Sequence, residues 1–408
     1  MKTANKSIPG GVTAPRGFRV AAGSAGLKRD PSLPDLALLV SEAPAAAAAV
    51  FTRNRVQAAP LLVCREHLAG GRRVRAVVVN AGNANACTGG QGLADARETA
   101  AAVAQGLGVA AEEVLVASTG VIGVPLPMAK LRAGLAGLPA KLEQSVGADE
   151  AAARAIMTTD TFPKFGAVEV ELNGVPVRVG GMAKGSGMIH PDLATMLAFL
   201  TTDADLPPAA LDAAFREVVD RTFNAVTVDG DTSTNDFAVL LANGQAKNPP
   251  VTPGSPAYAA FVAALEEVAG KLARDIARDG EGATKLLTIE VVHAPSDGAA
   301  RTIAKTVATS CLVKTAMFGE DPNWGRILAA AGRAPADFDP AKADVYLAGR
   351  LVARGGVAQP FDEAGLKAEL GRREIAVRLD LNQGDGAATV WSCDLSYDYV
   401  RINGRYRT

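Results

Sequence analysis

The chain has 408 residues, of which 48% are hydrophobic and 21% are charged, so it can bury a large core and form about two or three lobes. Its 42 basic and 43 acidic residues give a net charge of −1, which disfavours a nucleic-acid-binding protein or a polybasic membrane-surface protein. The 42 glycines and 23 prolines are too few for a low-complexity or fibrous chain.

The first half of the chain predicts strands that end in loops of small residues. Residues 73–80 (RVRAVVVN) are predicted to form a buried strand, because β-branched side chains dominate them. A loop over 80–92, a helix over 93–107 and a strand over 114–117 follow, and this strand runs into the turn STGVIG at 118–123. In α/β proteins such strand ends often present backbone N–H groups to a ligand.

Residues 167–179 form the clearest predicted hairpin. AVEVEL and VPVRV alternate around Asn173-Gly174, a pair that favours a two-residue turn. The glycine-rich segment 180–204 follows, and its pattern fits neither a regular helix nor a regular strand. This irregular segment between regular elements is a candidate for function.

The second half predicts further mixing of helices and strands. Helices are predicted over three stretches, residues 207–222, 256–277 (with Ser255 as its N-cap) and 299–317. Strands are predicted over 226–242, over 286–292 and, as three short strands, over 375–402. This mixture favours mixed or antiparallel sheets with helices on their outer faces, and a layered α/β/β/α sandwich is consistent with it.

Cysteines and histidines indicate no metal or disulfide site. The cysteines have no CxxC pair and are predicted to be reduced and mostly buried; they are Cys64, Cys87, Cys311 and Cys393. The three histidines are dispersed, and the DGD sequence of Asp229 and Asp231 is more often structural than metal-binding, so no metal is assigned. The first residues lack the apolar region of a signal peptide, so we expect a cytoplasmic protein.

The usual nucleophile and phosphate-binding motifs are absent, and with three histidines a Ser-His-Asp triad is not expected. An N-terminal threonine offers another route, because its own α-amino group, with a pKa of about 7.7–8.0, can act as the base. An internal threonine must first be exposed by cleavage of the preceding peptide bond. A glycine-rich approach and a small preceding residue favour such cleavage, and Ala194-Thr195 has both.

Residues 182–204 (MAKGSGMIHPDLATMLAFLTTDA) resemble the self-processing segment of the ornithine acetyltransferases, also called glutamate N-acetyltransferases, the ArgJ family of arginine biosynthesis. The resemblance covers most of the chain. Seven further blocks occur in the family's order: NAGNANACTG at 80–89, STGVIG at 118–123, MTTDTFPK at 157–164, VDGDTSTND at 228–236, EGATK at 281–285, GEDPNWGRI at 319–327 and YDYVRINGRYRT at 397–408.

The resemblance implies a fold and a division into two chains. The fold is an N-terminal-nucleophile-like α/β/β/α sandwich, of a type shared with a group of aminopeptidases, with an additional C-terminal α/β lobe. Self-cleavage between Ala194 and Thr195 gives an α chain, residues 1–194, and a β chain, residues 195–408, which includes the C-terminal lobe. The chains are expected to assemble as α2β2 in the cytoplasm, with no nucleic acid or membrane as partner.

The implied reaction moves an acetyl group from N²-acetyl-L-ornithine to L-glutamate by a ping-pong mechanism through an acetyl-Thr195 ester. Thr195 is then the nucleophile, and Thr119 and Gly120 form the oxyanion hole. The positions that contact substrate are Thr158, Lys184, Thr195, Glu281, Asn403 and Thr408. No cofactor is expected, and acetyl-CoA remains open as a further donor. Gly404-Arg405 departs from the small or acidic residues expected before the last three positions.

Each role has a physical reason. Lys184 can anchor a substrate carboxylate and lower the pKa of the α-amine by like-charge repulsion, and Glu281 can bind the ornithine ammonium. His190, near Thr195, is interpreted as a positioning residue, because the α-amine makes a second base redundant. Two alternatives stay open: an N-terminal-nucleophile aminopeptidase or amidohydrolase of the related fold, and a non-catalytic scaffold. The Thr nucleophile and the INGRYRT end favour transfer over hydrolysis.

Overall fold

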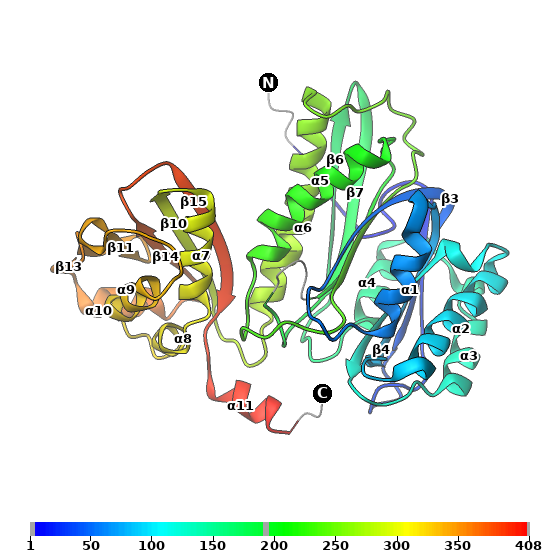
Figure 1. Ribbon diagram of the computed structural model, residues 1–408, viewed down its shortest axis with the longest axis horizontal. Helices are drawn as coiled ribbons and strands as arrows, with labels where there is room; N and C mark the ends of the chain where they lie inside the picture. The colour runs from blue at the N-terminus through cyan, green and yellow to red at the C-terminus, as the bar shows by residue number, and fades with distance from the viewer. Residues whose placement is uncertain (1–4, 191–195, 406–408) are drawn as a thin grey trace.

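The computed structural model describes residues 5–190 and 196–405, and the chain forms two lobes that follow each other along the sequence (Figure 1). Among these residues the larger lobe contains a nine-stranded sheet and the smaller lobe a six-stranded sheet. None of the helices in the described part of the chain is both long enough and apolar enough to span a membrane.

The larger sheet runs in the order β1-β6-β7-β8-β9-β3-β4-β5, and β2 pairs with β3 beside this path. Its strands are β1 (Lys6–Ile8), β2 (Phe18–Gly23), β3 (Leu36–Phe51), β4 (Val74–Asn83), β5 (Val114–Val121), β6 (Lys164–Leu172), β7 (Val175–Lys184), β8 (Leu197–Thr202) and β9 (Phe237–Ala242). The long β3 pairs with β2 and β4 through its first half and with β9 through its second half, with a register shift between Val40 and Ala45. β3 therefore belongs to both halves of the sheet.

Helices surround this sheet. They are α1 (Ala59–Leu68), α2 (Gly89–Leu107), α3 (Met128–Ala136), α4 (Val146–Ala155), α5 (Pro208–Arg221) and α6 (Pro256–Arg278), with short 3₁₀ turns at Ala69–Gly71, Ala111–Glu113, Pro139–Lys141 and Phe223–Ala225. The Ser255 hydroxyl accepts a hydrogen bond from Tyr258 N at 3.1 Å and caps α6, as predicted. The hairpin of β6 and β7 around Asn173-Gly174 is also confirmed.

The alternation of side chains along the strands separates the lobe into layers. Leu200 of β8 belongs to the same core as Phe215 of α5, whereas its neighbour Phe199 belongs, with Leu39 of β3, to a second core between the two halves of the sheet. On β4, Val78 faces a third core that α2 and α3 cover. The order helix, sheet, sheet, helix is the expected α/β/β/α sandwich, which is thereby confirmed.

The smaller lobe has the strand order β13-β12-β11-β14-β10-β15. Its elements are β10 (Leu286–Ala294), α7 (Asp297–Ala308), α8 (Cys311–Phe318), α9 (Trp324–Gly332), a 3₁₀ turn (Pro340–Lys342), β11 (Asp344–Leu347), β12 (Arg350–Arg354), β13 (Val357–Ala358), α10 (Glu363–Leu370), β14 (Glu374–Asp380) and β15 (Gly386–Cys393). Ile303 of α7, Ile327 of α9 and Val377 of β14 share its core. The additional C-terminal α/β lobe is therefore confirmed, and the chain then ends in α11 (Tyr397–Asn403) (Figure 1).

Four details differ from the expectations. Residues 226–236 form a loop, and the strand begins only at Phe237, because the side chains of Asp229 and Ser233 accept hydrogen bonds from local backbone N–H groups. The helix predicted over 299–317 is two helices, since the Ser310 hydroxyl accepts from Val313 N and starts α8. The last of the three C-terminal strands is α11, which Ser396 caps. Of the four cysteines, Cys87 and Cys311 are exposed.

The predicted cleavage point does not coincide with a boundary between the lobes. Ala194 and Thr195 lie outside the described residues, between β7 and β8, which are antiparallel neighbours in the larger sheet. Six residue pairs, from Val179↔Thr202 to Lys184↔Leu197, join these two strands. The division into 1–194 and 195–408 stays a prediction, and its two products would share one sheet.

Candidate active site

A cavity of about 270 Å³ opens where the ends of β5 and β7 meet the loop before β9, the segment after α6, and α11. Six of the predicted site residues line it: Thr119, Gly120, Thr158, Lys184, Glu281 and Asn403. Met196, which follows Thr195 in the sequence, lines it too. The remaining predicted site residues, Ala194, Thr195 and Thr408, lie outside the described residues. Residues far apart in the sequence therefore line one cavity, although their individual roles stay predictions.

The end of β5 brings Thr119 and Gly120 against β4. Gly120 has φ +131°, and a Cβ there would lie 2.3 Å from the carbonyl carbon of Gly82, so the close approach of the two strands requires glycine. The buried Asn235 side chain holds this place together, because its Nδ2 donates to Ala84 O at 2.6 Å and to Ser118 O at 2.8 Å. The turn predicted from STGVIG is thus a rigid strand end on the cavity wall.

Lys184 ends β7 with its side chain only 10% exposed. Its Nζ lies 3.4 Å from Thr119 Oγ1 and 4.0 Å from Asp160 Oδ2. Asp160 also accepts from Thr158 N at 3.0 Å and from Gly185 N at 2.7 Å. The Asp160 carboxylate therefore contacts the backbone on both sides of the cavity wall and faces the ammonium group of Lys184.

A fully buried ammonium, that of Lys164, lies beneath Lys184 and connects two sides of the cavity. Lys164 Nζ is 2.8 Å from Asp160 Oδ1 and 2.5 Å from Asp279 Oδ2. Burial raises the pKa of the Asp160 carboxyl, but Lys164 and Lys184 lower it more strongly, so its pKa lies well below the usual value. Asp160 and Lys164 belong to the block MTTDTFPK, so the sequence contained the signal, but their roles were not predicted.

Glu281 and Asn403 form the opposite wall. Asn403 Nδ2 donates to Glu281 Oε2 at 2.8 Å, so α11 brings the C-terminal part of the chain onto the larger lobe. Gly187 leaves room for this carboxyl group, because a Cβ there would lie 2.3 Å from Glu281 Cδ. Glu281 N in turn donates to Ser186 O at 2.9 Å, which ties this wall to the segment after Lys184.

Asp229 organises the segment at Met188 and Ile189, which lines the cavity. Its carboxylate accepts from Met188 N at 2.6 Å and from Ile189 N at 2.9 Å, as a structural role requires. His190 Nδ1 lies 3.1 Å from Thr227 Oγ1. Within residues 5–190 and 196–405, no group of three or more His, Cys, Asp and Glu side chains is placed to hold a metal ion.

Sequence reasoning missed one further residue of the cavity wall, Asp236. It is 2% exposed, and its Oδ2 has no hydrogen-bond partner among the described residues. The backbone N–H of the next residue, Phe237, donates to Met196 O at 3.0 Å, so Asp236 lies beside the start of β8. The sequence VDGDTSTND marks the region, but no local pattern shows which of its carboxyl groups lacks a partner.

The charges of the cavity suit a small zwitterion. Lys184 supplies a cation on one wall and Glu281 an anion on the other, and both are largely buried. Interactions between charges strengthen where water is excluded, so such a cavity can orient an amino acid by its carboxylate and its ammonium group. The strand end at Thr119 and Gly120 lines the same cavity and can offer a hydroxyl and a backbone N–H to a developing oxyanion.

Comparison with known proteins shows the family of the chain. The profile of the ArgJ family matches residues 19–408. The arginine biosynthesis bifunctional protein ArgJ of Symbiobacterium thermophilum is 53% identical over 98% of this chain and 99% of its own length. The protein of the same name from Geobacter sulfurreducens is 52% identical over 96% of this chain and 99% of its own length.

One solved structure is also similar, that of the arginine biosynthesis bifunctional protein ArgJ from Bacillus halodurans. It is 42% identical with a TM-score of 0.50, and the match covers 51% of this chain and 98% of that chain. A family profile over nearly the whole sequence, together with relatives at about half identity from end to end, leaves one conclusion. The chain belongs to the ArgJ family.

Proposed function

We propose that this protein transfers the acetyl group of N²-acetyl-L-ornithine to L-glutamate, giving L-ornithine and N-acetyl-L-glutamate. The observation that carries the proposal is the convergence of Thr119, Gly120, Lys184 and Glu281 on one cavity that Met196 also lines. The relatives named above support the pathway, since both are called arginine biosynthesis bifunctional proteins.

Self-cleavage after Ala194 would prepare the nucleophile. The cut would free the α-amino group of Thr195, and the six residue pairs between β7 and β8 would keep the two products joined. The Bacillus halodurans match supports two chains, because 98% of that solved chain corresponds to only 51% of this one. We further infer that the two products assemble as α2β2 and act in the cytoplasm.

In the first half-reaction, the Thr195 hydroxyl attacks the acetyl carbonyl and its proton passes to the α-amino group. The Thr119 hydroxyl and the Gly120 N–H stabilise the oxyanion, a contribution of about 10²–10³ in rate for one such donor. The C–N bond then breaks, the departing nitrogen takes the proton, and ornithine leaves. An acetyl-Thr195 ester remains.

In the second half-reaction, the amine of glutamate attacks the acetyl-Thr195 ester, and the same groups act in reverse.

Lys184 holds the substrate carboxylate, and Glu281, oriented by Asn403, holds the ammonium of the ornithine side chain. Thr158 and Thr408 are proposed to complete the contacts. One amide is exchanged for a similar one, so the reaction needs no ATP, metal or organic cofactor.

Product analysis with and without glutamate tests this function. Release of ornithine that requires glutamate, with matching formation of N-acetylglutamate, supports transfer. Release at the same rate without glutamate would instead identify an amidohydrolase of the related fold. A second arm with acetyl-CoA and glutamate decides whether acetyl-CoA is also a donor. Intact mass spectrometry of the active protein should show two chains, and full turnover by a single uncut chain contradicts the mechanism.

A further inference from the structure

The carboxyl group of Asp236 is the one polar side chain of the cavity that the proposed mechanism does not use and that is incompletely bonded. Its side chain is 2% exposed, and in the described part of the chain Oδ2 accepts no hydrogen bond. A buried carboxyl oxygen without a donor is costly, so natural proteins rarely keep one without a reason.

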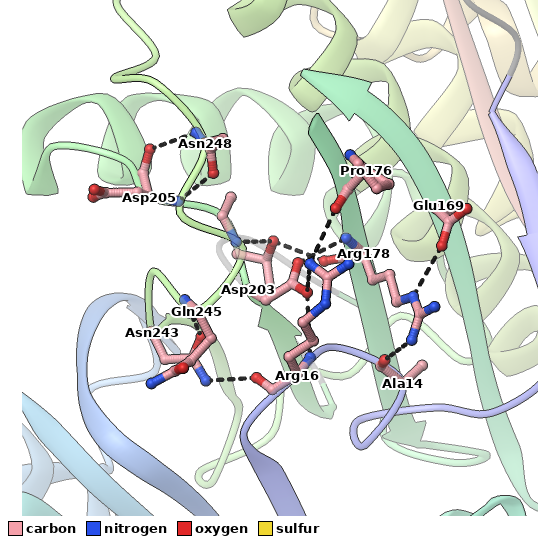
Figure 2. A network of polar contacts seen from close by, with 12 residues as sticks. Ala14, Arg16, Glu169, Pro176, Arg178, Asp203, Asp205, Asn243, Gln245 and Asn248 are labelled. Atoms are coloured by element: carbon pink, nitrogen blue, oxygen red, sulfur yellow. Dashed lines mark hydrogen bonds and ion pairs between the residues drawn. The ribbon is translucent and has the colours of Figure 1, made fainter. Parts of the chain in front are cut away.

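Other buried aspartates of the same lobe show what complete bonding looks like. Asp149 accepts from Gly11 N at 2.6 Å and from Thr13 N and Thr13 Oγ1, each at 2.9 Å. Asp203 accepts from Arg178 N at 2.8 Å and pairs with Arg16 Nη1 at 3.1 Å (Figure 2). Against these two, Asp236 stands out because it belongs to the cavity wall while its buried Oδ2 has no donor in the described part of the chain.

The surroundings of Asp236 indicate which chemical class of ligand its carboxyl group can bind. Phe237 N donates to Met196 O at 3.0 Å, and Thr52 N donates to the carbonyl of Asp236 at 3.0 Å, so the backbone of Asp236 is held on both sides. A carboxylate accepts hydrogen bonds and attracts cations, and the substrates of the proposed reaction are amines. A protonated amine supplies both a donor and the missing positive charge.

We propose that Asp236 Oδ2 accepts a hydrogen bond from a protonated amino group inside the cavity and stabilises that ammonium during acetyl transfer. The inference rests on the proposed function. The amine has two possible sources, the α-amine that cleavage frees and the amine of the incoming amino acid. In both cases the bonds made and broken are those of the transfer itself. The negative charge of Asp236 stabilises the amine while the amine carries the proton, and Asp236 itself is unchanged at the end of the reaction.

Several charged groups share the cavity wall with Asp236 and set the background for its pH dependence. They are the charged groups Lys184 on β7, Asp229 and Asp231 in the preceding loop and Glu281 after α6, together with the titratable phenol of Tyr399 on α11. Arg53 follows Thr52, whose backbone N–H donates to the carbonyl of Asp236. Burial raises the pKa of the Asp236 carboxyl well above its usual value, and Ser233, Thr52 and Lys184 lower it only in part. An ammonium group beside it would lower this pKa further and would have its own pKa raised.

Asp236→Asn is the sharpest test, because it keeps size and shape and removes only the charge. We expect the mature variant to cleave normally and to lose about 10²-fold in kcat/KM near neutral pH. The acidic limb of its pH profile should move down by about one unit, since the amine loses its anionic neighbour. Asp203→Asn is the matched control: it changes another buried aspartate of the same sheet and should leave both limbs in place.

Single-turnover kinetics separates the two sources of the amine. If the freed α-amine is the partner, Asp236→Asn shifts the acidic limb of the pH profile in both steps, acetylation by acetylornithine and transfer to glutamate. If the partner is the incoming amine, only transfer to glutamate shifts. Unshifted limbs in both steps, or an Asp236→Asn chain that stays uncut, overturn the inference, whereas absence of transfer by the wild type overturns the proposed function itself.

Infrared spectroscopy keeps the inference testable if the variant folds poorly. The uncut Thr195→Ala protein lacks the new α-amine, so it should show a protonated-carboxyl band that disappears when Asp236→Asn is added. The mature wild type, with an amine present, should lack that band. Persistence of the band in the mature enzyme across neutral pH contradicts an ion pair at Asp236.

Discussion

Two buried aspartates lie at opposite ends of the parallel strands β8 and β9, and their surroundings differ. Asp203 follows the end of β8, where Arg16 and Arg178 satisfy its oxygens within a wider polar network that includes Glu169 (Figure 2). Asp236 precedes the start of β9, on the cavity, with one oxygen left free among the described residues. The difference separates a buried carboxyl group whose oxygens are both bonded from one that, within the described ranges, lacks a donor on one oxygen.

The comparison predicts that changes at the cavity end cost activity and that changes at the Asp203 end cost stability. The two ends belong to the same sheet, so a general loosening of the sheet would affect both measures together. Separate effects on turnover and on unfolding are therefore the result that supports the distinction. The predictions below test it, beginning with the largest expected effect.

Replacement of Thr195 by Ala should abolish activity completely at the cavity end. Without the side-chain hydroxyl neither cleavage nor ester formation can proceed, so the protein should remain one chain with no detectable transfer. Thr195→Ser keeps a hydroxyl and should still be cut. Intact mass and product formation measure both effects, and a Thr195→Ala protein that separates into two chains would show that cleavage occurs elsewhere.

Gly120→Ala should cost at least about 10²-fold in kcat, the loss typical of a disturbed oxyanion hole. The added Cβ would lie 2.3 Å from the carbonyl carbon of Gly82 and would push the ends of β4 and β5 apart. Gly137→Ala is the control, because nothing lies within 4 Å of a Cβ there. Full activity of Gly120→Ala would mean that this strand end does not contribute to the reaction.

Replacement by Asn should change the free energy of unfolding in opposite directions at the two aspartates. In the uncut Thr195→Ala background, Asp203→Asn should lower the free energy of unfolding by about 1–3 kcal/mol, because Arg16 loses its partner. Asp236→Asn should raise it by about 1 kcal/mol at pH 8, because it removes an incompletely bonded buried acid.

The pH dependence checks the sign of the Asp236 effect. Burial raises the folded-state pKa of Asp236 above the ordinary value of 3.8, so the folded protein holds this proton more tightly than the unfolded chain. The stability contributed by that proton is complete below about pH 3.8 and is lost as the pH rises through the folded-state pKa. Denaturant unfolding at pH 4 and pH 8 should therefore show the advantage of Asp236→Asn mainly at pH 8.

Asn403→Ala should produce the smallest effect. It removes the 2.8 Å hydrogen bond to Glu281, so KM for acetylornithine should rise roughly tenfold while kcat changes little. Arg401→Ala on the same helix removes only an exposed pair with Asp398 and should leave KM unchanged. Equal effects of both changes would point to disruption of α11 as a whole.

Local patterns predicted correctly several of the helices and strands that were assigned from the sequence. The β6–β7 hairpin and the cap at Ser255 depend on neighbouring residues, so the sequence contains their full signal. The errors at residues 226–236, at Ser310 and at α11 arose where short polar side chains bond to the nearby backbone and replace a strand or interrupt a helix.

The sequence alone determined the family blocks, the type of several elements and the identity of six residues around the cavity. The tertiary structure decided that Thr119, Glu281 and Asn403 share one cavity, since they come from three separate segments. It also decided that Asp203 is paired, whereas Asp236 Oδ2 has no partner within residues 5–190 and 196–405. The physical reason is that a carboxyl group is satisfied or left free by whatever lies across the sheet from it, and neighbours along the chain do not record this.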